Sequence, residues 1–559
     1  MNKDEIDELK KDYEKEKGNI KVPFEMIVNQ VETFEKGIPF LKLVRPCTIG
    51  EGLHVIDEEE DYEELISAFQ EAIEEERIIK FVPASGAASR MFKKLQAVLN
   101  KFGDVKRYVL EEAISHNDED SIGVLEFVDN IKWFAFYPDL KFEMADDGYD
   151  FEILLNEGNY SQILRYTLDS IGLNYVNQPK GSIKFHNYPD GARTAFEEHL
   201  IEAIHYAKAE EKPAKVHFTI SPEYRELINS IVKEAIEQHK KAGDNIQVSY
   251  SYQKPSTDTI AVTIDNKPFK DAEGNLVFRP AGHGALLENL NDLKGDIILI
   301  KNIDNLVTDH LKGTTYLYKK LLTGYLIRTQ NKIFTYMRAL ESEDISLSTI
   351  NSIKQFAESE LSIQFDETSM KRKITNKKMN TIRVPSDLNK KLYSDESFDS
   401  LTTDLQIKKL KEKLNRPIRI CGMVKNERES GGAPFWVEDE DATVSLQIVE
   451  MTQIDLNNEE QKKILEGSTH FNPVDIVCGV RDYKGNPFNL LKYTNPDTGL
   501  IAIKSKDGRE LKALELPGLW NGSMAKWITV FVKVPMITFN PVKEVNDLLR
   551  KEHQPPEKN

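Results

Sequence analysis

Apolar residues recur every three or four positions through the first part of the chain, between polar and acidic stretches. The last such series comprises Tyr62, Leu65, Ile66, Phe69 and Ile73. This spacing places the apolar side chains on one face of a helix. We therefore expect residues 1–76 to form a helical N-terminal region with a short break at Pro39–Gly52. The acidic cluster Asp57–Glu64 would be a solvated helix face.

The pattern changes at residue 77, where a short apolar run, Arg77–Pro83, leads into the small residues of Ala84–Phe92. A run of this length, followed by small residues and a helical pattern, predicts a buried strand, a tight loop and a helix. Residues 96–176 then carry mainly helical periodicity, with one candidate β-ribbon at Lys132–Ile153.

Strands and helices alternate from Lys180 onward. The expected helices are Phe196–Ala209, Glu223–Lys241 and Gly284–Leu293, and the expected strands are Lys215–Ile220, Asn245–Tyr252 and Asp296–Lys301. Such alternation predicts an α/β fold with a mixed, mostly parallel sheet and helices on both faces. In sheets of this kind ligands bind beyond the carboxyl ends of the strands.

Two further regions complete the chain. Residues 306–415 are helical in pattern, with a long candidate helix at Asp309–Glu341 and basic clusters at Lys371–Lys373 and Lys377–Lys378 that we interpret as a solvated connector. Beyond Pro417 the candidate strands are Ile418–Val424, Pro434–Val437, Val444–Glu450, Ile476–Val480, Leu500–Lys504 and Trp527–Val534. Residues 546–559 form a tail, and we expect its end, Glu552–Asn559, to be frayed.

Composition limits the partners of the chain. Its 559 residues include 74 Lys and Arg against 92 Asp and Glu, a formal charge of −18, which opposes binding of nucleic acid through a net basic surface. The first residues lack the apolar core of a secretory signal, and no run of 18 apolar residues occurs. Cys47, Cys421 and Cys478 form no CxxC pair, which suits a reducing compartment. We expect a cytoplasmic protein with no membrane or nucleic-acid partner.

The loop Ser85–Met91, between the expected strand and helix, is the first segment that suggests chemistry. Its small side chains let backbone N–H groups approach an anion, and Arg90 offers a planar fork for phosphate oxygens. The loop has neither the GxGxxG nor the GxxxxGK[ST] spacing, so dinucleotide-binding and P-loop motifs are excluded. A phosphate cradle and tight helix packing are both consistent with these residues.

Three later segments follow this loop in a fixed order: Pro179–Lys184, Arg279–Leu287 and Asp296–Asn305. The succession of small-residue loop with arginine, Pro-Lys, glycine-rich helix start and strand with terminal aspartate resembles sugar-nucleotide pyrophosphorylases, whose loop reads Gly-x-Gly-Thr/Ser-Arg-Met. The phrases PASGAASRMF, PFWV, HFNPVD and ALELPGLWNG also resemble an uncharacterised bacterial family, domain of unknown function 4301, over nearly the full length. That second resemblance carries no activity with it.

The resemblance to the pyrophosphorylases implies a role for each matching residue. The implied nucleotide-binding residues are Ser85, Gly86, Ala87, Ser89, Gln253, Gly282 and Gly284, and the implied catalytic cations are Arg90 and Lys180. The implied sugar-binding residues are Gly422, Glu450 and Asn472, and the implied Mg²⁺ ligands are Asp304 and Asn521. Ala88 departs from the family, which has its second glycine at that position.

The same resemblance implies how the chain is organised. Residues 77–305 would be the nucleotide-binding α/β half, interrupted by a helical insertion at 96–176. Residues 306–415 would be a second helical insertion, and residues 416–545 would be a β-rich sugar- and metal-binding half that completes the same domain.

The implied activity is that of a Mg²⁺-dependent nucleotidyltransferase, which joins a nucleoside triphosphate, with UTP as the expected one, to a sugar-1-phosphate and releases pyrophosphate. A phosphate monoester is already ionised at neutral pH, so this reaction needs no general base. The lack of a Ser-His-Asp signature is therefore consistent with it, and the lack of HExxH or a His/Cys cluster argues against zinc.

Each assignment has a structural alternative. Asp304 could cap the next turn, and Asn521 could be the first residue of an Asn-Gly turn. Arg90 and Lys180 could be surface charges, and Glu450 could be an exposed strand position. Two other functions also remain open: a non-catalytic nucleotide-sugar binding protein, and a glycosyltransferase using a nucleotide-sugar donor. The latter usually has an Asp-x-Asp pair, whereas Ile303–Asn305 supplies one carboxylate.

Overall fold

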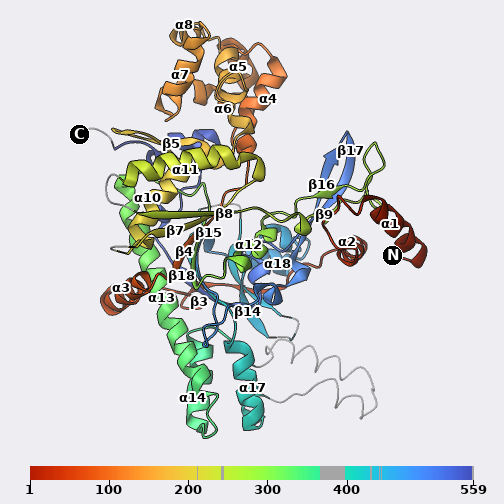
Figure 1. Ribbon diagram of the computed structural model, residues 1–559, viewed down its shortest axis with the longest axis vertical. Coiled ribbons are helices and arrows are strands. Elements are labelled where there is room, and N and C mark those ends of the chain that lie inside the picture. Colours follow the sequence, from red (N-terminus) through yellow and green to blue (C-terminus); the bar gives the residue numbers. More distant parts are fainter. Residues whose placement is uncertain are drawn as a thin grey trace. The chain divides into compact units, whose positions relative to one another are not determined.

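A computed structural model describes residues 1–209, 212–240, 245–365, 397–427, 431–439, 441 and 443–556 (Figure 1). The basic clusters at Lys371–Lys373 and Lys377–Lys378 lie outside these described residues. The chain divides into two compact units. Unit 1 comprises Met1–Glu71, Gln253–Leu299 and Leu321–Val534, and unit 2 comprises Ala72–Tyr252, Ile300–Lys320 and Pro535–Asn559. Among the described helices, none combines the length and the apolar character that a membrane crossing requires.

The largest sheet has nine strands. In spatial order they are β2 (Thr48–Ile49), β3 (Gly52–His54), β18 (Ile528–Lys533), β12 (Ile418–Lys425), β15 (His470–Gly479), β11 (Ile297–Lys301), β4 (Ile78–Pro83), β7 (Ala214–Thr219) and β8 (Ile246–Ser251). The pairs β2–β3, β3–β18, β18–β12, β4–β7 and β7–β8 are parallel, and β12–β15 is antiparallel. The predicted mixed, mostly parallel α/β sheet is therefore confirmed. All residues of β11 and β15 are buried, as expected for strands covered on both faces.

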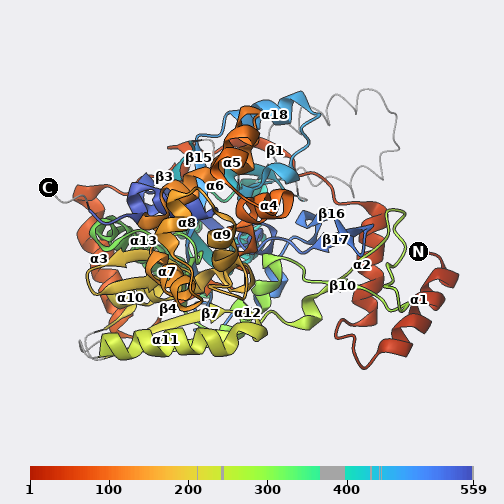
Figure 2. The same ribbon diagram turned by 90° about the horizontal axis from the view of Figure 1, so that it is seen from above.

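The helices of unit 2 that follow the predicted alternation are α10 (Ala195–Ala207) and α11 (Arg225–Lys240). Thr194 caps α10, because its Oγ1 accepts a hydrogen bond from the Glu197 N–H at 3.2 Å. Helix α10 packs against β4 and β7 and lies beside α11 (Figure 2). One element differs from the sequence prediction: a hairpin, β5 (Lys184–Tyr188) and β6 (Gly191–Thr194), separates the Pro179–Lys184 segment from the helix expected to follow it.

The long helical stretch of unit 2 contains α4 (Lys93–Phe102), α5 (Arg107–Ser115), α6 (Glu119–Asp129), α7 (Tyr137–Asp146), α8 (Phe151–Asn156) and α9 (Ser161–Leu168) (Figure 1). The β-ribbon expected at Lys132–Ile153 is wrong, because this stretch holds α7 and the start of α8. Phe136, Leu140 and Met144 are buried, whereas Pro138 and Phe142, which a strand would place on the same face, are exposed, so the burial follows a helical and not a strand period.

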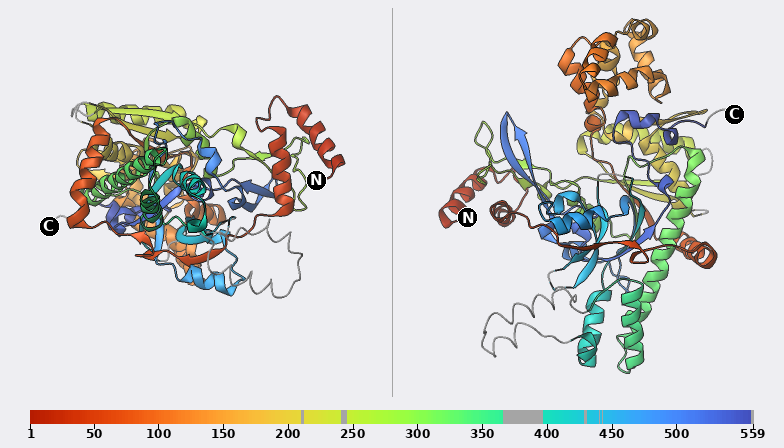
Figure 3. Two further views of the ribbon diagram at one scale, coloured as in Figure 1. Left: turned by 90° about the horizontal axis from the view of Figure 1, so that it is seen from below. Right: turned by 180° about the vertical axis from the view of Figure 1, so that it is seen from behind.

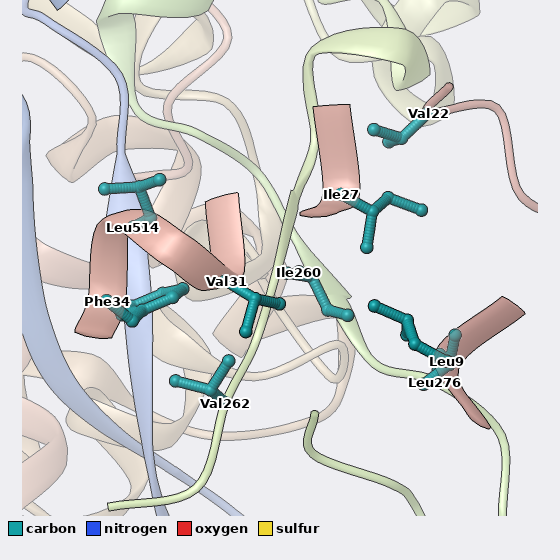
Figure 4. Close-up of a cluster of buried hydrophobic side chains, with 9 residues drawn as sticks. All are labelled: Leu9, Val22, Ile27, Val31, Phe34, Ile260, Val262, Leu276 and Leu514. Atoms are coloured by element: carbon teal, nitrogen blue, oxygen red, sulfur yellow. The ribbon is translucent and has the colours of Figure 1, made fainter. Parts of the chain in front are cut away.

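The N-terminal helices of unit 1, α1 (Lys3–Glu16) and α2 (Phe24–Lys36), pack on a small β-ribbon. Ile27, Val31 and Phe34 of α2 contact a core that includes Ile260 of β9 (Thr259–Ile260) and Leu514 of β17 (Arg509–Glu515) (Figure 4). Strand β17 pairs with β16 (Leu500–Lys506) and was not expected from the sequence. Strands β1 (Leu43–Pro46) and β2 lie in the predicted break, β3 begins at its last residue, and the next helix is α3 (Glu58–Glu74).

Several of the remaining elements follow the sequence prediction. The long helix expected at Asp309–Glu341 is α13 (Lys312–Ala339), and it is followed by α14 (Leu347–Ser359). In unit 1, α14 lies beside α17 (Thr403–Leu414) (Figure 3). Strands β13 (Ala433–Glu438) and β14 (Val444–Val449) pair with each other, and β13 also pairs with β1. Helix α12 (Leu286–Leu293) follows the glycine-rich segment, as expected.

Strand β15, however, begins six residues before the strand expected at Ile476–Val480, and the helix α18 (Glu459–Glu466) was not expected. The end of the chain, expected to be frayed from Glu552, instead holds a buried His553.

Candidate functional site

In unit 2, the small-residue loop is hydrogen-bonded to the Pro-Lys segment. The Ala88 N–H donates to the Gln178 carbonyl at 2.9 Å, and the Lys180 N–H donates to the Gly86 carbonyl at 3.1 Å. The two segments thus form a short antiparallel bridge centred on Ala87 and Pro179. The structure therefore brings together two predicted segments that the sequence places about ninety residues apart.

The tip of this loop is open. Gly86, Ala87 and Arg90 are exposed, whereas Ser85 and Ser89 are partly buried. A methyl group added at Gly86 would meet no atom within 4 Å. Ala88, where the pyrophosphorylases have their second glycine, is fully buried. Because its N–H already donates to the Gln178 carbonyl, that amide is not available to a ligand. The open amides are those of Gly86 and Ala87, which donate no hydrogen bond within the described part of the chain.

Lys180 and Asp304 form an ion pair in the same unit. The Lys180 ammonium donates to Asp304 Oδ2 at 2.6 Å, and the two side chains are 15% and 22% exposed. Asp304 lies shortly after β11, and its carbonyl accepts a hydrogen bond from the Val542 N–H at 3.1 Å. The predicted strand-end carboxylate and the predicted Pro-Lys lysine therefore meet. Arg90 makes no ion pair with any described residue.

Behind this pair lies a buried charge network that the sequence did not predict. Glu202 of α10 accepts from Lys80 of β4 at 3.0 Å and from Lys301 of β11 at 2.6 Å. Burial alone would raise the pKa of Glu202, but the two ammonium groups outweigh it and hold the pKa well below its usual range. Burial lowers the pKa of Lys80 to about 7. His199, one helical turn before Glu202, donates from Nε2 to the Ile303 carbonyl at 3.1 Å.

This network ties α10 to the residue that precedes Asp304. A signal was present in the sequence, because Lys80 and Lys301 interrupt or end short apolar runs and His199 and Glu202 share one helix face. This pattern does not by itself indicate a buried charge network, since a lysine in an apolar run is also typical of a strand end.

In unit 1, Glu450 and Asn521 form a second cluster. Asn521 Nδ2 donates to Glu450 Oε1 at 2.7 Å, and Asn521 Oδ1 is buried without a hydrogen-bond partner among the described residues. Gly432 lies next to both, since a methyl group on it would be 3.9 Å from Asn521 Oδ1 and from Glu450 Cγ. Glu450 is therefore not the exposed strand residue of the alternative interpretation.

Asn472 joins this cluster through its backbone. Its N–H donates to the Gly432 carbonyl at 2.9 Å, and its side-chain Oδ1 accepts from the Val474 N–H at 3.0 Å. Gly422, also expected to bind sugar, packs differently. A methyl group there would lie 3.1 Å from the Val534 side chain and 3.3 Å from that of Leu322, so core packing accounts for the glycine.

The glycines expected to contact the base also have a packing role in unit 1. A methyl group on Gly284 would lie 2.1 Å from the Pro517 carbonyl oxygen, so this glycine permits two backbones to meet. Gly282 has φ +74°, a conformation that favours glycine. Between them, His283 Nδ1 accepts from the Leu519 N–H at 3.0 Å, and its ring stacks on Trp520 at 4.3 Å.

The predicted residues thus fall into separate groups. The loop Ser85–Ser89, Arg90, Lys180 and Asp304 belong to unit 2, and Gln253, Gly282, Gly284, Gly422, Glu450, Asn472 and Asn521 belong to unit 1. Within unit 2 the structure joins the loop, Lys180 and Asp304. Within unit 1 it joins Glu450, Asn472 and Asn521, while Gln253 lies partly buried shortly after β8.

The side chains present can be compared with what Mg²⁺ requires. Mg²⁺ prefers oxygen ligands and usually keeps several waters, with one or two carboxylates and substrate phosphates completing its shell. Asp304 offers a carboxylate whose Oδ2 already holds the Lys180 ammonium, and Asn521 offers an amide oxygen without a partner in the described structure. The described residues contain no group of three or more His, Cys, Asp or Glu that could hold a metal ion. Within unit 2, the Asp304 carboxylate fits an ion brought with phosphates, and the described residues form no cage around one.

Comparison of the sequence with family models identifies the family of the chain. The model of Domain of unknown function (DUF4301) matches residues 10–392 and 370–554, which together span most of the chain. The chain belongs to this family. Among curated proteins, no sequence matches it significantly.

Several solved structures are similar to this one. They include uridine diphosphate N-acetylglucosamine pyrophosphorylase from Trypanosoma brucei (11% identity, 94% of this chain and 74% of that chain, TM-score 0.43). A putative UDP-N-acetylglucosamine pyrophosphorylase from Entamoeba histolytica has 12% identity, coverage of 89% and 83%, and a TM-score of 0.40. UDP-glucose pyrophosphorylase from Leishmania major has 11% identity, coverage of 97% and 78%, and a TM-score of 0.41. At these values the similarity assigns neither a substrate nor an activity to this chain.

Proposed function

We propose that the chain is a Mg²⁺-dependent nucleotidyltransferase that joins a nucleoside triphosphate, with UTP as the expected substrate, to a sugar-1-phosphate. A phosphate oxygen of the sugar-1-phosphate attacks the α-phosphorus, the bond from that phosphorus to the β-phosphate oxygen breaks, and pyrophosphate leaves. The observation that carries the proposal is the Lys180–Asp304 pair, which the backbone bridge holds beside the open loop at Gly86.

The charges of unit 2 support binding of a polyphosphate. The open amides of Gly86 and Ala87 are donors for phosphate oxygens, and the exposed Arg90 provides a guanidinium for the same purpose. Lys180 offsets charge on the triphosphate and on the departing pyrophosphate. Because nucleotidyl transfer depends mainly on positioning and charge neutralisation, these groups suffice without a general base.

Asp304 would hold the magnesium ion in this proposal. Bound Mg²⁺ would supply charge neutralisation between phosphate oxygens. The Asp304 carboxylate has the required oxygen chemistry, and its pairing with Lys180 keeps the carboxylate oriented when no nucleotide is present.

The cluster of unit 1 supports recognition of a sugar. Glu450 provides a carboxylate acceptor for hydroxyl groups, and Asn521 holds that carboxylate through its Nδ2. In this proposal Asn521 is therefore the residue that orients Glu450. Its buried, partnerless Oδ1 is an acceptor that a substrate hydroxyl or amide N–H would complete after a small local adjustment.

The test is release of pyrophosphate from nucleoside triphosphates mixed with sugar-1-phosphates and Mg²⁺. Asp304→Asn and Lys180→Met should each lower kcat by about a hundredfold or more, because each removes a charge that stabilises the transferring phosphates. Asp146→Asn and Lys233→Met are matched controls on exposed helix positions of the same unit and should keep full turnover. Absence of pyrophosphate with every nucleotide and sugar combination would refute the proposal, and equal turnover in Asp304→Asn would remove Asp304 from the mechanism.

A second candidate function is binding of a nucleotide-sugar without turnover. Two observations favour it: the Lys180 ammonium already pairs with Asp304 Oδ2, and the Ala88 N–H already donates to the Gln178 carbonyl. Ligand binding raises apparent stability by RT ln(1 + [L]/Kd), so thermal shifts with UTP and UDP-sugars would report it. A clear shift without pyrophosphate release selects this function, whereas release of free nucleoside diphosphate selects a glycosyltransferase.

A further inference from the structure

A cavity of about 420 Å³ lies within unit 1, apart from the loop and the ion pair of unit 2. Strands β13 and β14, the end of α17 and the residues leading into β18 contribute its walls. Val437, Leu446 and Ile448 are buried and give it an apolar side. A volume of roughly 300–1,000 Å³ with apolar walls and a few convergent polar groups is typical of small-molecule sites.

One polar group of this cavity is Arg416, which lies two residues after the end of α17. Its Nε donates to the Glu412 carbonyl at 2.7 Å, and its Nη1 lies 3.5 Å from the Lys526 carbonyl oxygen. Both partners are neutral, and no described carboxylate lies within ion-pair distance of Arg416. Burial lowers the pKa of Arg416, which shows that its surroundings do not fully compensate the positive charge.

The second polar group is Asp439, at the end of β13. Its Oδ1 accepts a hydrogen bond from Ser445 Oγ at 2.9 Å, and no described lysine or arginine forms an ion pair with it. Burial raises the pKa of Asp439 to about 6. Two neighbouring pairs of charges are matched, since Lys413 pairs with Asp441 at 3.4 Å and Lys42 pairs with Glu438 at 2.7 Å, and the other charged side chains of the cavity, Asp497 and Lys526, are exposed.

Arg416 and Asp439 therefore line one cavity with opposite charges and without an ion pair between them. Each is partly buried, and the two attract each other without an ion-pair contact, which leaves part of the desolvation cost uncompensated in the free protein. A ligand that supplies an anion to Arg416 and a cation to Asp439 would recover both losses together. A simple anion would satisfy Arg416 and leave Asp439 unpaired, and a simple cation would do the reverse.

We propose that this cavity binds a small zwitterion of the α-amino acid type, with its carboxylate against Arg416, its ammonium against Asp439 and an apolar side chain against Val437, Leu446 and Ile448. A guanidinium binds a carboxylate through parallel N–H donors, and an ammonium binds a carboxylate as a compact charge. Asn521 of the Glu450 cluster also lines this cavity, but none of these five residues has a role in the nucleotidyltransferase proposal, so binding of an amino acid can be tested separately from it.

The experiment uses the full chain and measures binding by calorimetry and thermal shift at neutral pH. The probes are L-leucine and the other apolar amino acids at millimolar concentration. For leucine, 4-methylpentanoate lacks the ammonium, and 3-methylbutan-1-amine lacks the carboxylate. The amino acid that binds should have an affinity at least about tenfold higher than that of each of its one-charge analogues. A tenfold ratio corresponds to about 1.4 kcal/mol of binding free energy. If no apolar amino acid binds, or if a one-charge analogue binds equally well, the proposal is overturned.

Variants test which side chain binds the carboxylate of the amino acid and which binds its ammonium group. Asp439→Asn keeps the shape of the side chain and removes a costly buried charge, so the free chain should be at least as stable as before while the affinity for the amino acid falls about tenfold. Arg416→Gln should also lower the affinity for the amino acid about tenfold. Arg416→Lys is a second variant that keeps the charge and should recover part of that affinity.

Lys526→Gln is the matched control, because Lys526 is an exposed cation of the same cavity. If Lys526→Gln weakens binding as much as Arg416→Gln does, the carboxylate does not bind at Arg416 and the assignment fails.

Discussion

The ammonium of Lys180 lies 2.6 Å from the carboxylate of Asp304, although 124 positions separate the two residues in the chain. The pair is mostly buried and stands where a short backbone bridge fixes the Lys180 main chain to Gly86. A charge pair in this position links the loop at Gly86 to the end of β11 within unit 2. The contribution of this pair to the free energy of unfolding can be measured independently of any enzymatic activity.

Removing one member of this pair should destabilise the chain. Lys180→Met leaves a mostly buried carboxylate without its cation, which should lower the free energy of unfolding by about 1–3 kcal/mol. The double variant Lys180→Met with Asp304→Asn should regain part of the loss, because no charge is then left unpaired. Urea unfolding of the two single variants and the double variant gives the coupling. Strictly additive effects would show that the two side chains do not interact in solution.

Glu202 should be more important still for stability. It is the carboxylate shared by the buried ammonium groups of Lys80 and Lys301, so Glu202→Gln leaves both without their shared anion. We expect a loss of about 3–5 kcal/mol, or failure to fold at elevated temperature. Glu226→Gln, at an exposed position of α11, is the control and should change stability by no more than about 0.5 kcal/mol.

Two glycines of the candidate site should respond in opposite ways to the same substitution. Gly284→Ala places a methyl group 2.1 Å from the Pro517 carbonyl oxygen and should cost about 1–3 kcal/mol or more. Gly86→Ala meets open space, so its stability should stay near that of the unchanged chain, while any nucleotide that approaches the loop should bind more weakly. Thermal unfolding with and without UTP separates the two effects. A large loss of stability in Gly86→Ala would contradict the open loop.

Asp439 should give a pH-dependent contribution to stability with a definite sign. Its pKa is raised from its ordinary value of 3.8 to about 6 in the folded chain. Between these values the folded state holds a proton that the unfolded state has lost, so this residue makes stability fall as the pH rises through the window. Above about pH 6 Asp439 is ionised in both states, and the destabilisation that its charge causes no longer changes with pH.

Comparison with Asp439→Asn isolates this effect. The stability of the variant relative to the unchanged chain should increase from about pH 4 to pH 6 and then level off. Urea midpoints across this range provide the measurement. A difference that does not change with pH would mean that Asp439 titrates at its ordinary pKa.

Much of the α/β sheet could be predicted from hydrophobic pattern alone. Buried strands such as β7 and β11 give short apolar runs, and the amphipathic helices α10 and α11 have the helical spacing that distinguishes them. Strand β17 could not be found in this way, because its sequence RELKALE has no strict alternation and includes good helix formers. Its pairing with β16 decides its conformation.

The candidate site was accessible only in part. The roles of Lys180 and Asp304 were predicted from the family resemblance, and no local sequence pattern indicates that the two side chains form an ion pair. The network of Lys80, Glu202 and Lys301 could not be predicted, because its members come from three elements up to 221 positions apart and only tertiary packing joins them. Likewise, Gly284 suggested a ligand contact, whereas the structure shows that a neighbouring carbonyl requires it.

The two hydrogen bonds between Gly86, Ala88, Gln178 and Lys180 close the chain at the point where the helical stretch α4–α9 leaves and re-enters the rest of unit 2. Such a closure fixes the exit and return of the backbone whatever lies beyond it. The helices of that stretch can therefore be shortened, exchanged or elaborated over evolutionary time while the loop that they interrupt keeps its shape, and the same junction offers a natural position for engineered domain grafts.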